Sequence, residues 1–535
     1  MGIFTFMPSG AGGIIVRVET DIRRGIPGVD ISGLAEGAVR EARDRVRAAF
    51  RNSGFSFPLD RILINLAPAG LKKDGAALDL PIALSVMAAA GLVAVTGDLL
   101  IMGELELSGR IRPVRGVLAA VAAGLAEGIH EFIVPSQNST EAAILTDKGA
   151  RFTAAENLQG AVHALVMREK NGVLPESLDE VFSSTAPIAA KAASSSANAA
   201  AGTEDCGDFS DVRGQTIYKR ALEIAAAGGH NTLVFGPPGA GKTMLARRLP
   251  SIMAPLTPDE AVEVTRLHSL AGPRNGFIDK LITKPPFRAP HHTASAEGVL
   301  GGGRIPRPGE ISLAHFGVLF LDEAPEFRIN VLQALREPLE DREISIVRAE
   351  GPVRLPAEFQ LLLTANSCRC GRLGLHSTEN ACLCSPEEIN RYWRKFGGAL
   401  LDRVEIRTAI LPPKIEEMGV HNNSGDGEKS AAIAQRVRAA VEIQRDRFKG
   451  TGIRRNAMLP AGKTAVLCTT SEKAENALHT AVSKLGLSGR AYHGILRVAR
   501  TIADLEGKDI IETEHILEAV QHRRLGEDPW DILSI

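Results

Sequence analysis

The segment from Gly236 to Thr243 reads GPPGAGKT and matches the pattern G-x-x-x-x-G-K-[ST] in full. It follows the apolar run TLVFG and precedes the helical MLARRL, the context in which this pattern forms a P-loop. Glycines let the backbone wrap phosphate groups, and amides at a helix start donate to them. Lys242 is expected to contact the β- and γ-phosphates of ATP, and the Thr243 hydroxyl to coordinate Mg²⁺. The predicted cofactor-binding residues are Gly236, Pro237, Pro238, Gly239, Ala240, Gly241, Lys242, Thr243 and, as argued next, Asp322.

A second motif, VLFLDE, ends another apolar run about eighty residues further along. Asp322 at the end of this run is expected to bind Mg²⁺ through its water shell. Glu323 then stands where a carboxylate can polarise the attacking water. Asn366 ends the next apolar run, LLLTAN, and is expected to orient that water, with a turn-capping role as the alternative. Together these residues predict hydrolysis and not binding alone.

Four of the six cysteines fall within seventeen residues, in the spacing C-x-C-x₁₁-C-x-C. Four thiolates in two close pairs suit tetrahedral Zn²⁺. Reduced free thiols and redox chemistry are the alternatives, because one-residue spacers are less common than two-residue spacers in zinc sites. The candidate ligands are Cys368, Cys370, Cys382 and Cys384, with His376 and the pair His291 and His292 as alternatives for which a loop or core role fits better.

The elements that must position these side chains follow from the alternation of short apolar runs with helical patterns, which is typical of a doubly wound parallel sheet. Strands are expected at Thr232–Gly236, Gly317–Asp322 and Phe359–Asn366. Each ends at polar or glycine residues, and ligands bind at the carboxyl ends of strands in open α/β sheets. We therefore predict an α/β fold with the P-loop and both motifs at one sheet edge.

Composition divides the chain into domains, because 535 residues exceed what one core organises. Residues 183–205 read SSTAPIAAKAASSSANAAAGTED, and such small side chains favour a flexible linker. We predict an N-terminal domain at residues 1–182, an ATPase domain at 206–420 and a C-terminal domain at 430–535. The last shows apolar residues at spacings of three and four, which indicates helices.

Bulk composition excludes several classes of protein. Hydrophobic residues make up 44% and charged residues 23%, and the net charge is -1, so nucleic-acid binding would need local basic patches. Six cysteines argue against a disulfide framework. The start MGIFTFMPSG shows no signal peptide, and Leu80 to Val95, about sixteen residues, reads as a buried helix and not as a membrane span. A cytoplasmic protein without membrane contact is expected.

Longer stretches carry a family resemblance. The run FRAPHHTASAEGVLGGGRIPRPGEISLAHFGVLFLDEAPEF, followed by LQALREPLEDREISIVRAEGPVRLPAEFQLLLTANSCRCG, resembles the magnesium-chelatase-like ComM (YifB) family of bacterial AAA+ proteins over almost the whole chain. The resemblance implies a P-loop AAA+ core with a C-terminal helical lid, a homohexamer, and a DNA helicase that promotes branch migration in recombination or natural transformation. An ATP-driven protein remodeller of the chelatase type is the alternative. A non-catalytic scaffold is a third, against which the Asp322-Glu323 pair argues.

The resemblance also assigns roles to arginines. ALLDRVEI resembles an arginine-finger segment, so Arg403 would contact the γ-phosphate of a neighbouring subunit. The family usually reads SGPLLDRID there, whereas this chain reads FGGALLDRVE and keeps the arginine. SGRAYHGILRVARTIADL resembles the sensor-2 helix, with Arg490 as the first choice and Arg500 as the second.

The segment DREISIVRAEGPVRLPAE reads as two short strands with a glycine turn, at the place where related motors carry a hairpin into the central pore. Its arginines are candidates for sequence-independent contacts with DNA phosphates, and a solvated hairpin surface is the alternative. These candidates are Arg342, Arg348 and Arg354.

The N-terminal stretch NLAPAGLKKDGAALDLPIAL, followed by IMGELELSGRIRPVRGVLAAVAAGLAEGI, resembles the α+β domain of Lon-type proteases. Those proteases need a nucleophilic Ser and a Lys that activates it. Ala77 stands where the Ser would be, and the apolar VLAAV occupies the Lys region. The resemblance therefore implies a domain without peptidase activity, with a binding or assembly role.

Overall fold

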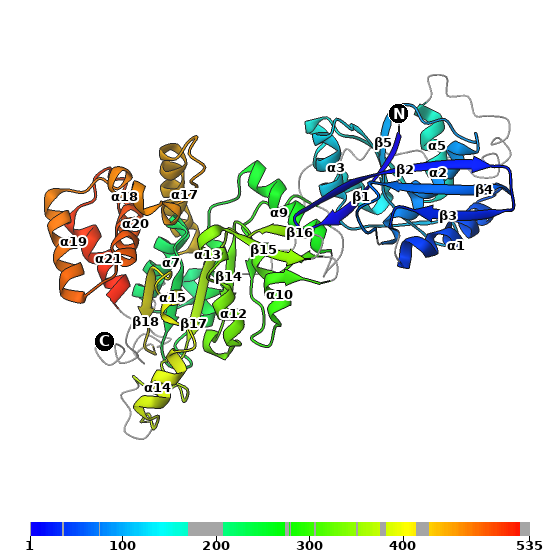
Figure 1. Ribbon diagram of the computed structural model, residues 1–535. Helices are drawn as coiled ribbons and strands as arrows, with labels where there is room; N and C mark the ends of the chain where they lie inside the picture. The colour runs from blue at the N-terminus through cyan, green and yellow to red at the C-terminus, as the bar shows by residue number, and fades with distance from the viewer. Residues whose placement is uncertain are drawn as a thin grey trace.

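The computed structural model describes residues 2–34, 37–73, 75–168, 207–272, 278, 280–303, 306–348, 351–374, 381–412 and 427–524. An N-terminal α/β body, a central α/β body and a C-terminal helical body follow one another along the chain, from blue to red in Figure 1. The expected parallel sheet and helical C-terminus are confirmed. The linker predicted at 183–205 lies outside the described residues and stays a prediction.

A seven-stranded sheet organises the N-terminal body. Its elements are β1 (Gly2–Ser9), β2 (Gly12–Arg23), β3 (Gly28–Ser32), α1 (Gly37–Asn52), β4 (Arg61–Ala67), α2 (Asp79–Ala89), β5 (Asp98–Ile101), β6 (Glu104–Leu105), β7 (Ile111–Arg112), α3 (Val117–Ala126), β8 (Glu131–Pro135), α4 (Ser139–Ala143), β9 (Arg151–Ala155) and α5 (Leu158–Arg168). The strand order is β3-β4-β2-β1-β5-β8-β9, with an antiparallel β1–β2 hairpin and parallel pairs from β5 to β9. Helices α1, α2 and α5 cover one face of the sheet, and α3 and α4 cover the other.

The apolar run that begins at Leu80 forms the buried helix α2, as expected. Alternate residues of β5 face the two cores, Leu99 and Ile101 on one side and Leu100 on the other. Among the described residues, no helix is long and apolar enough to cross a membrane.

The central body contains a five-stranded sheet in which every strand pair is parallel. Its elements are α7 (Thr216–Gly228), β10 (Thr232–Phe235), α8 (Lys242–Ala246), α9 (Pro258–Ala271), β11 (Phe287–Arg288), α10 (Ala296–Leu300), β12 (Gly301–Gly302), β13 (Arg307–Pro308), α11 (Glu310–Leu313), β14 (Val318–Leu321), α12 (Ile329–Ala334), α13 (Pro338–Asp341), β15 (Glu343–Arg348), β16 (Gly351–Pro356), β17 (Gln360–Ala365), α14 (Pro386–Trp393), α15 (Gly398–Leu401) and β18 (Ile406–Ala409). The order β11-β14-β17-β10-β18 places β14, β17 and β10 side by side. These are the three strands predicted from the sequence, and the prediction is confirmed.

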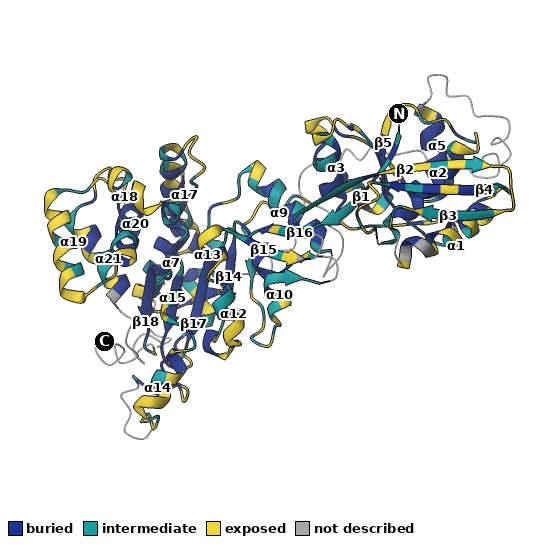
Figure 2. Cartoon of the chain, viewed as in Figure 1, coloured by how far each residue is buried: buried dark blue, intermediate teal, exposed yellow. Residues whose placement is uncertain are grey.

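Helices cover both faces of this sheet, which is why β10, β14 and β17 are buried along their whole length; Figure 2 shows β14 and β17 in dark blue. One face packs against α10, α11, α12 and α14. The other packs against α7, α8 and the first helix of the C-terminal body, α17 (Ser430–Arg447).

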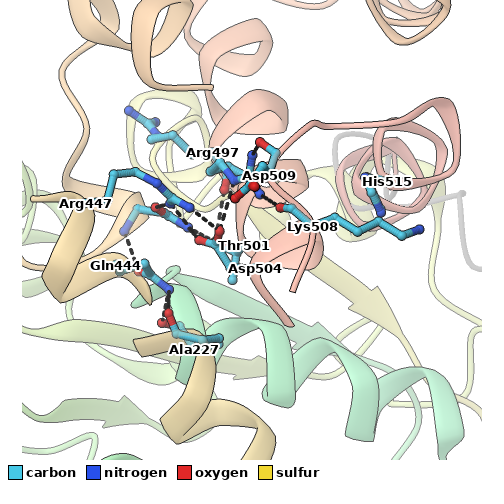
Figure 3. A network of polar contacts seen from close by, with 12 residues as sticks. Ala227, Gln444, Arg447, Arg497, Thr501, Asp504, Lys508, Asp509 and His515 are labelled. Atoms are coloured by element: carbon cyan, nitrogen blue, oxygen red, sulfur yellow. Dashed lines mark hydrogen bonds and ion pairs between the residues drawn. The ribbon is translucent and has the colours of Figure 1, made fainter. Parts of the chain in front are cut away.

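The C-terminal body continues with α18 (Ala461–Leu467), α19 (Glu472–Leu485), α20 (Gly489–Leu505) and α21 (Thr513–Arg524), which share a core with α7. A buried polar network joins these helices (Figure 3). The Asp504 carboxylate accepts hydrogen bonds from the guanidinium of Arg447 at 2.5 and 2.9 Å, from the Asn456 amide at 2.8 Å and from Arg500 at 3.1 Å. One buried and one partly buried guanidinium therefore share one carboxylate.

The N-terminal body packs directly on the central body. Helix α3 lies against α9, whose Leu270 belongs to the N-terminal core. The buried carboxylate of Glu141 accepts a hydrogen bond from the hydroxyl of Ser269 in α9. At a second contact, in the β1–β2 turn, Ala11 packs against the core of the central body and Gly10 lies close to Val353 of β16.

Replacement of Asp504 by Ala is expected to destabilise the C-terminal body by about 3–5 kcal/mol, because it leaves the buried Arg500 and the partly buried Arg447 without their carboxylate. Calorimetric unfolding of the full chain should show this loss as a lowered transition temperature. Asp446→Ala, at an exposed position of the same region, is the matched control and should change the transition little. Equal transition temperatures for the two variants would contradict the role given to Asp504.

Candidate nucleotide site

The loop from Gly236 to Gly241 connects β10 to α8 at the carboxyl edge of the parallel sheet. Gly236 has φ 159°, and a Cβ at this residue would lie 2.1 Å from the Ile410 carbonyl oxygen, so only glycine fits. Gly239 and Gly241 have φ values of 78° and 88°, which favour glycine in the same way. The local backbone therefore explains the glycine positions of the motif.

Lys242 is the central side chain of this loop and is 8% exposed. Its ammonium donates hydrogen bonds to the carbonyl oxygens of Gly236 and Pro237, both at 2.8 Å, and to Oδ1 of Asn366 at 3.0 Å. Burial lowers the Lys242 pKa to about 8, against the opposing effect of the Asp322 and Glu323 carboxylates. A group this desolvated gains from an anionic partner such as a phosphate.

Asp322 and Thr243 form the second contact of the site. The Thr243 hydroxyl lies 3.0 Å from both carboxylate oxygens of Asp322. The Thr364 hydroxyl of β17 also donates to Asp322, at 2.5 Å, and accepts from the backbone N–H of Glu323 at 3.0 Å. Hydroxyl and carboxylate oxygens are the ligands that Mg²⁺ prefers, so Thr243 and Asp322 fit the expected ion.

Glu323 follows Asp322 with φ 50°, a left-handed conformation that is rare outside glycine and often found at functional sites. Its side chain is exposed, as a group that activates water must be. Thr364, which supports this turn, escaped the sequence analysis, although it lies within the quoted LLLTAN. Only the pairing of β14 with β17 brings it to Asp322.

Arg403 and Arg490 form a second group around Glu340. Arg403 donates to Glu340 and, at 2.7 Å, to the Ala399 carbonyl oxygen. Arg490 of α20 donates to the other oxygen of Glu340 at 3.2 Å and lies 3.8 Å from Asp402. The hydrogen bond from Arg403 lowers the pKa of Glu340. In the described chain, no hydrogen bond or ion pair joins Arg403 or Arg490 to the nucleotide loop, Asp322 or Glu323.

Arg500, the second candidate for the sensor-2 role, is buried and makes its hydrogen bonds within the C-terminal body. Its side chain is 1% exposed, pairs with Asp504 and donates to the carbonyl oxygens of Lys508 and Asp509. Arg490 is 40% exposed on the same helix. Of the two, Arg490 is therefore the residue that can reach a ligand.

The hairpin β15–β16 is present, and its arginines differ in environment. Arg354 is 72% exposed and pairs with Glu343 at 3.3 Å. Arg342 precedes β15, is partly buried and donates to the Met458 carbonyl oxygen of the C-terminal body at 3.0 Å. The side chain of Arg348 lies outside the description.

The Lon-like region of the N-terminal body is apolar where a peptidase would carry its dyad. Ala77 packs against the core formed by α3, and Val117 and Leu118 of VLAAV are fully buried. Lys73 is buried as well, and its ammonium donates to the Pro68 carbonyl oxygen. Ala77, Val117 and Leu118 therefore contribute to the packing of the core.

The sulfur atoms of the four clustered cysteines lie close together in space. The Sγ atoms of Cys368 and Cys370 are 3.3 Å apart, and each lies 3.6 Å from that of Cys382. All four sulfur atoms, including that of Cys384, lie within 4.8 Å of one another. Of the alternative ligands, His291 contacts Thr293 and the ring of His292, and His376 lies outside the described residues.

Three known protein families match different parts of this chain. Residues 208–418 match the family described as magnesium chelatase, subunit ChlI; residues 18–138 match subunit ChlI of Mg-chelatase; and residues 427–523 match the ChlI C-terminal family. The N-terminal part is also similar to the Lon protease of Desulfovibrio desulfuricans, at 26% identity over 138 residues, 24% of this chain and 16% of that protein.

Two relatives match over nearly their full length. The chain is 40% identical to competence protein ComM of Haemophilus influenzae over 96% of this chain and 95% of that protein. It is 39% identical to the uncharacterised protein YifB of Escherichia coli over 95% of this chain and 94% of that protein. The chain therefore belongs to the ComM/YifB family of magnesium-chelatase-like AAA+ ATPases.

Proposed function

We propose that this chain is the subunit of a hexameric ring that hydrolyses ATP with Mg²⁺ and moves branched or single-stranded DNA. The observation that carries the proposal is the division of the predicted catalytic residues into two groups. Lys242, Thr243, Asp322, Glu323 and Asn366 gather at the carboxyl ends of three adjacent strands. The two candidate arginines gather elsewhere, around Glu340.

In this proposal, the nucleotide site becomes complete only when two subunits assemble side by side. We assign the first group to the nucleotide of its own subunit and Arg403 to the γ-phosphate of a neighbour. Arg490 shares Glu340 with Arg403, so we assign it to the same neighbour's nucleotide. A surface pocket of about 590 Å³, lined by Glu340, Arg403 and residues of β15, lies beside this pair and has room for side chains of the adjoining subunit.

DNA is the proposed substrate for two reasons. The relative ComM is named a competence protein, and the family resemblance implies branch migration. The β15–β16 hairpin presents Arg354 and an 80% exposed Val347, a combination that suits contact with a nucleic-acid backbone and its bases. We propose Arg354 and Arg348 as phosphate contacts, and Arg342 as a support for the base of the hairpin.

Two further parts of the proposal concern ions and location. We propose Zn²⁺ as the ligand of the four cysteines, in a structural role, because four sulfur ligands leave no open coordination position. We place the motor in the cytoplasm, where ATP and chromosomal DNA are found. An ATP-driven protein remodeller is the second candidate, since all three matching families carry the magnesium chelatase name.

Glu323→Gln is expected to bind ATP with unchanged affinity and to hydrolyse it about 10² to 10⁴ times more slowly, because the amide cannot take a proton from water. Single-turnover hydrolysis and titration with a fluorescent ATP analogue measure the two steps. Glu326→Gln, three residues away and exposed, is the control and should hydrolyse ATP normally. Normal turnover by Glu323→Gln would remove Glu323 as the base.

Arg403→Ala and Lys242→Ala are each expected to lose ATPase activity, and a mixture of the two to recover part of it. In a mixed ring, an Arg403→Ala subunit supplies an intact nucleotide loop to the intact arginine of its Lys242→Ala neighbour. Arginine fingers increase the rate by a factor of about 10³ to 10⁵, so the ATPase activity of the mixture should be well above that of either variant alone. Arg391→Ala, exposed on α14, should remain active alone. A mixture no more active than its components would contradict the arrangement in trans.

Forked or four-way DNA is expected to bind the chain and to stimulate its ATPase at moderate salt. Arg354→Ala should weaken DNA binding. It should also reduce the slope of log K against log salt concentration by about one. Arg61→Ala in the N-terminal body is the matched control, because Arg61 is 68% exposed and pairs with Asp30 as Arg354 pairs with Glu343. Fluorescence anisotropy measures both. ATP hydrolysis without any DNA binding would favour the protein remodeller.

A further inference from the structure

We infer that the zinc ion of the four cysteines is a positioning element of the ATPase, which holds Asn366 in place for hydrolysis. The inference rests on the ATP hydrolysis proposed above and is independent of DNA. It assigns the cysteine cluster to the hydrolytic step and not to nucleotide binding.

The four sulfur atoms fit one tetrahedral ion. Zinc–sulfur bonds of about 2.3 Å place the sulfurs of such a site about 3.8 Å apart. The sulfur–sulfur distances of 3.3 and 3.6 Å and the outer limit of 4.8 Å bracket this separation. All four cysteines are free thiols, and a set of sulfur donors selects zinc over Mg²⁺.

The ion would join two elements that the chain leaves apart. The first pair, Cys368 and Cys370, follows directly on the end of β17 and Asn366. The second pair, Cys382 and Cys384, directly precedes α14, whose N-cap is Ser385. One ion bound by both pairs would fix the start of α14 against the end of β17.

Helix α14 in turn holds the backbone around Asn366. The indole N–H of Trp393 donates to the Ser367 carbonyl oxygen at 2.9 Å, and the hydroxyl of Tyr392 lies 3.3 Å from the backbone N of Asn366. The Trp393 ring also packs edge-on against Phe235, the last residue of β10, at 5.2 Å between centroids. The segment carrying Asn366 is therefore supported from α14 on one side and by Cys368 on the other.

The cysteine segment also touches the nucleotide loop. A Cβ at Gly371 would lie 2.8 Å from Cδ of Pro238, so the turn that follows Cys370 lies directly against the loop. Gly371 has φ 76°, which only glycine adopts readily, and this allows the close approach. A displaced cysteine segment would thus alter both Asn366 and its spacing from the loop.

Loss of the ion is expected to slow hydrolysis while ATP binding persists. Lys242 keeps its hydrogen bonds to the carbonyl oxygens of its own loop, and Thr243 keeps its contact with Asp322. None of these contacts involves the cysteines. Asn366 loses the support of its segment and orients water poorly. The result is a fall in kcat with little change in ATP affinity.

The test uses the full chain with Cys384→Ser and Cys384→His variants. We expect one zinc per wild-type chain by elemental analysis, no zinc in Cys384→Ser, and zinc retained in Cys384→His, since an imidazole can replace one thiolate. The kcat for ATP without DNA should fall tenfold or more in Cys384→Ser and recover in Cys384→His. The Kd for a fluorescent ATP analogue should stay within about twofold in both.

Cys468→Ser is the control, because Cys468 is a buried free cysteine outside the cluster. A second arm treats the wild type with a zinc-selective chelator, restores Mg²⁺, and then adds zinc back. Turnover should fall when zinc is removed and recover when zinc is added back. Because this arm uses the wild-type chain, it distinguishes loss of the ion from misfolding of a variant.

Zinc-free wild-type protein, or zinc-free Cys384→Ser with normal kcat, would overturn the inference. So would a parallel loss of ATP affinity, kcat and thermal stability, which indicates a purely structural ion. Failure of the proposed DNA function shows instead as absent DNA stimulation, which leaves these DNA-free measurements unaffected. Absence of basal hydrolysis in the zinc-loaded wild type would refute the proposed ATPase itself.

Discussion

The buried ammonium of Lys242 is the interaction on which the nucleotide site depends. A desolvated charge must keep its partners, and here they are two carbonyl groups of its own loop and the side chain of Asn366 at the end of another strand. The same charge therefore draws the loop and β17 together. Phosphate oxygens are stronger partners for an ammonium than an amide is. In the proposed function, an arriving triphosphate would compete for Lys242 and release Asn366 toward water, so binding of the substrate would itself prepare the next step.

The sequence predicts what depends on local order and misses what depends on tertiary neighbours. The glycine loop, Asp322, Glu323 and Asn366 stand at strand ends, and a parallel sheet brings strand ends together whatever the rest of the fold. Glu340 was missed because its partner Arg490 is 150 residues away. Arg490 and Arg500 lie ten residues apart on one helix and so point about 80° apart. Only the packing of α20, which buries Arg500, distinguishes the two.

The helical body is tied to the segment of Arg403 by charge as well as by packing. Glu405 pairs with Arg497 of α20 at 2.8 Å, and Arg523 of α21 pairs with Asp402 at 3.0 Å. These contacts flank Arg403 on both sides. A tilt of α20 relative to the sheet would therefore carry Arg403 and Arg490 together. If Arg403 acts on another subunit as proposed, the helices that follow the sheet would serve as its lever.

The contact of α3 with α9 has a practical consequence for dissection of this protein. Leu270 packs in the core of the N-terminal body while its helix belongs to the central body, so the two bodies share a buried apolar contact. Cutting the chain between them would uncover apolar surface on both fragments and strand the Glu141 carboxylate without its hydroxyl partner. Poor solubility of the isolated central body would then be a result of this exposed apolar surface. Point substitutions in the intact chain are the sounder route to learning what the N-terminal body contributes.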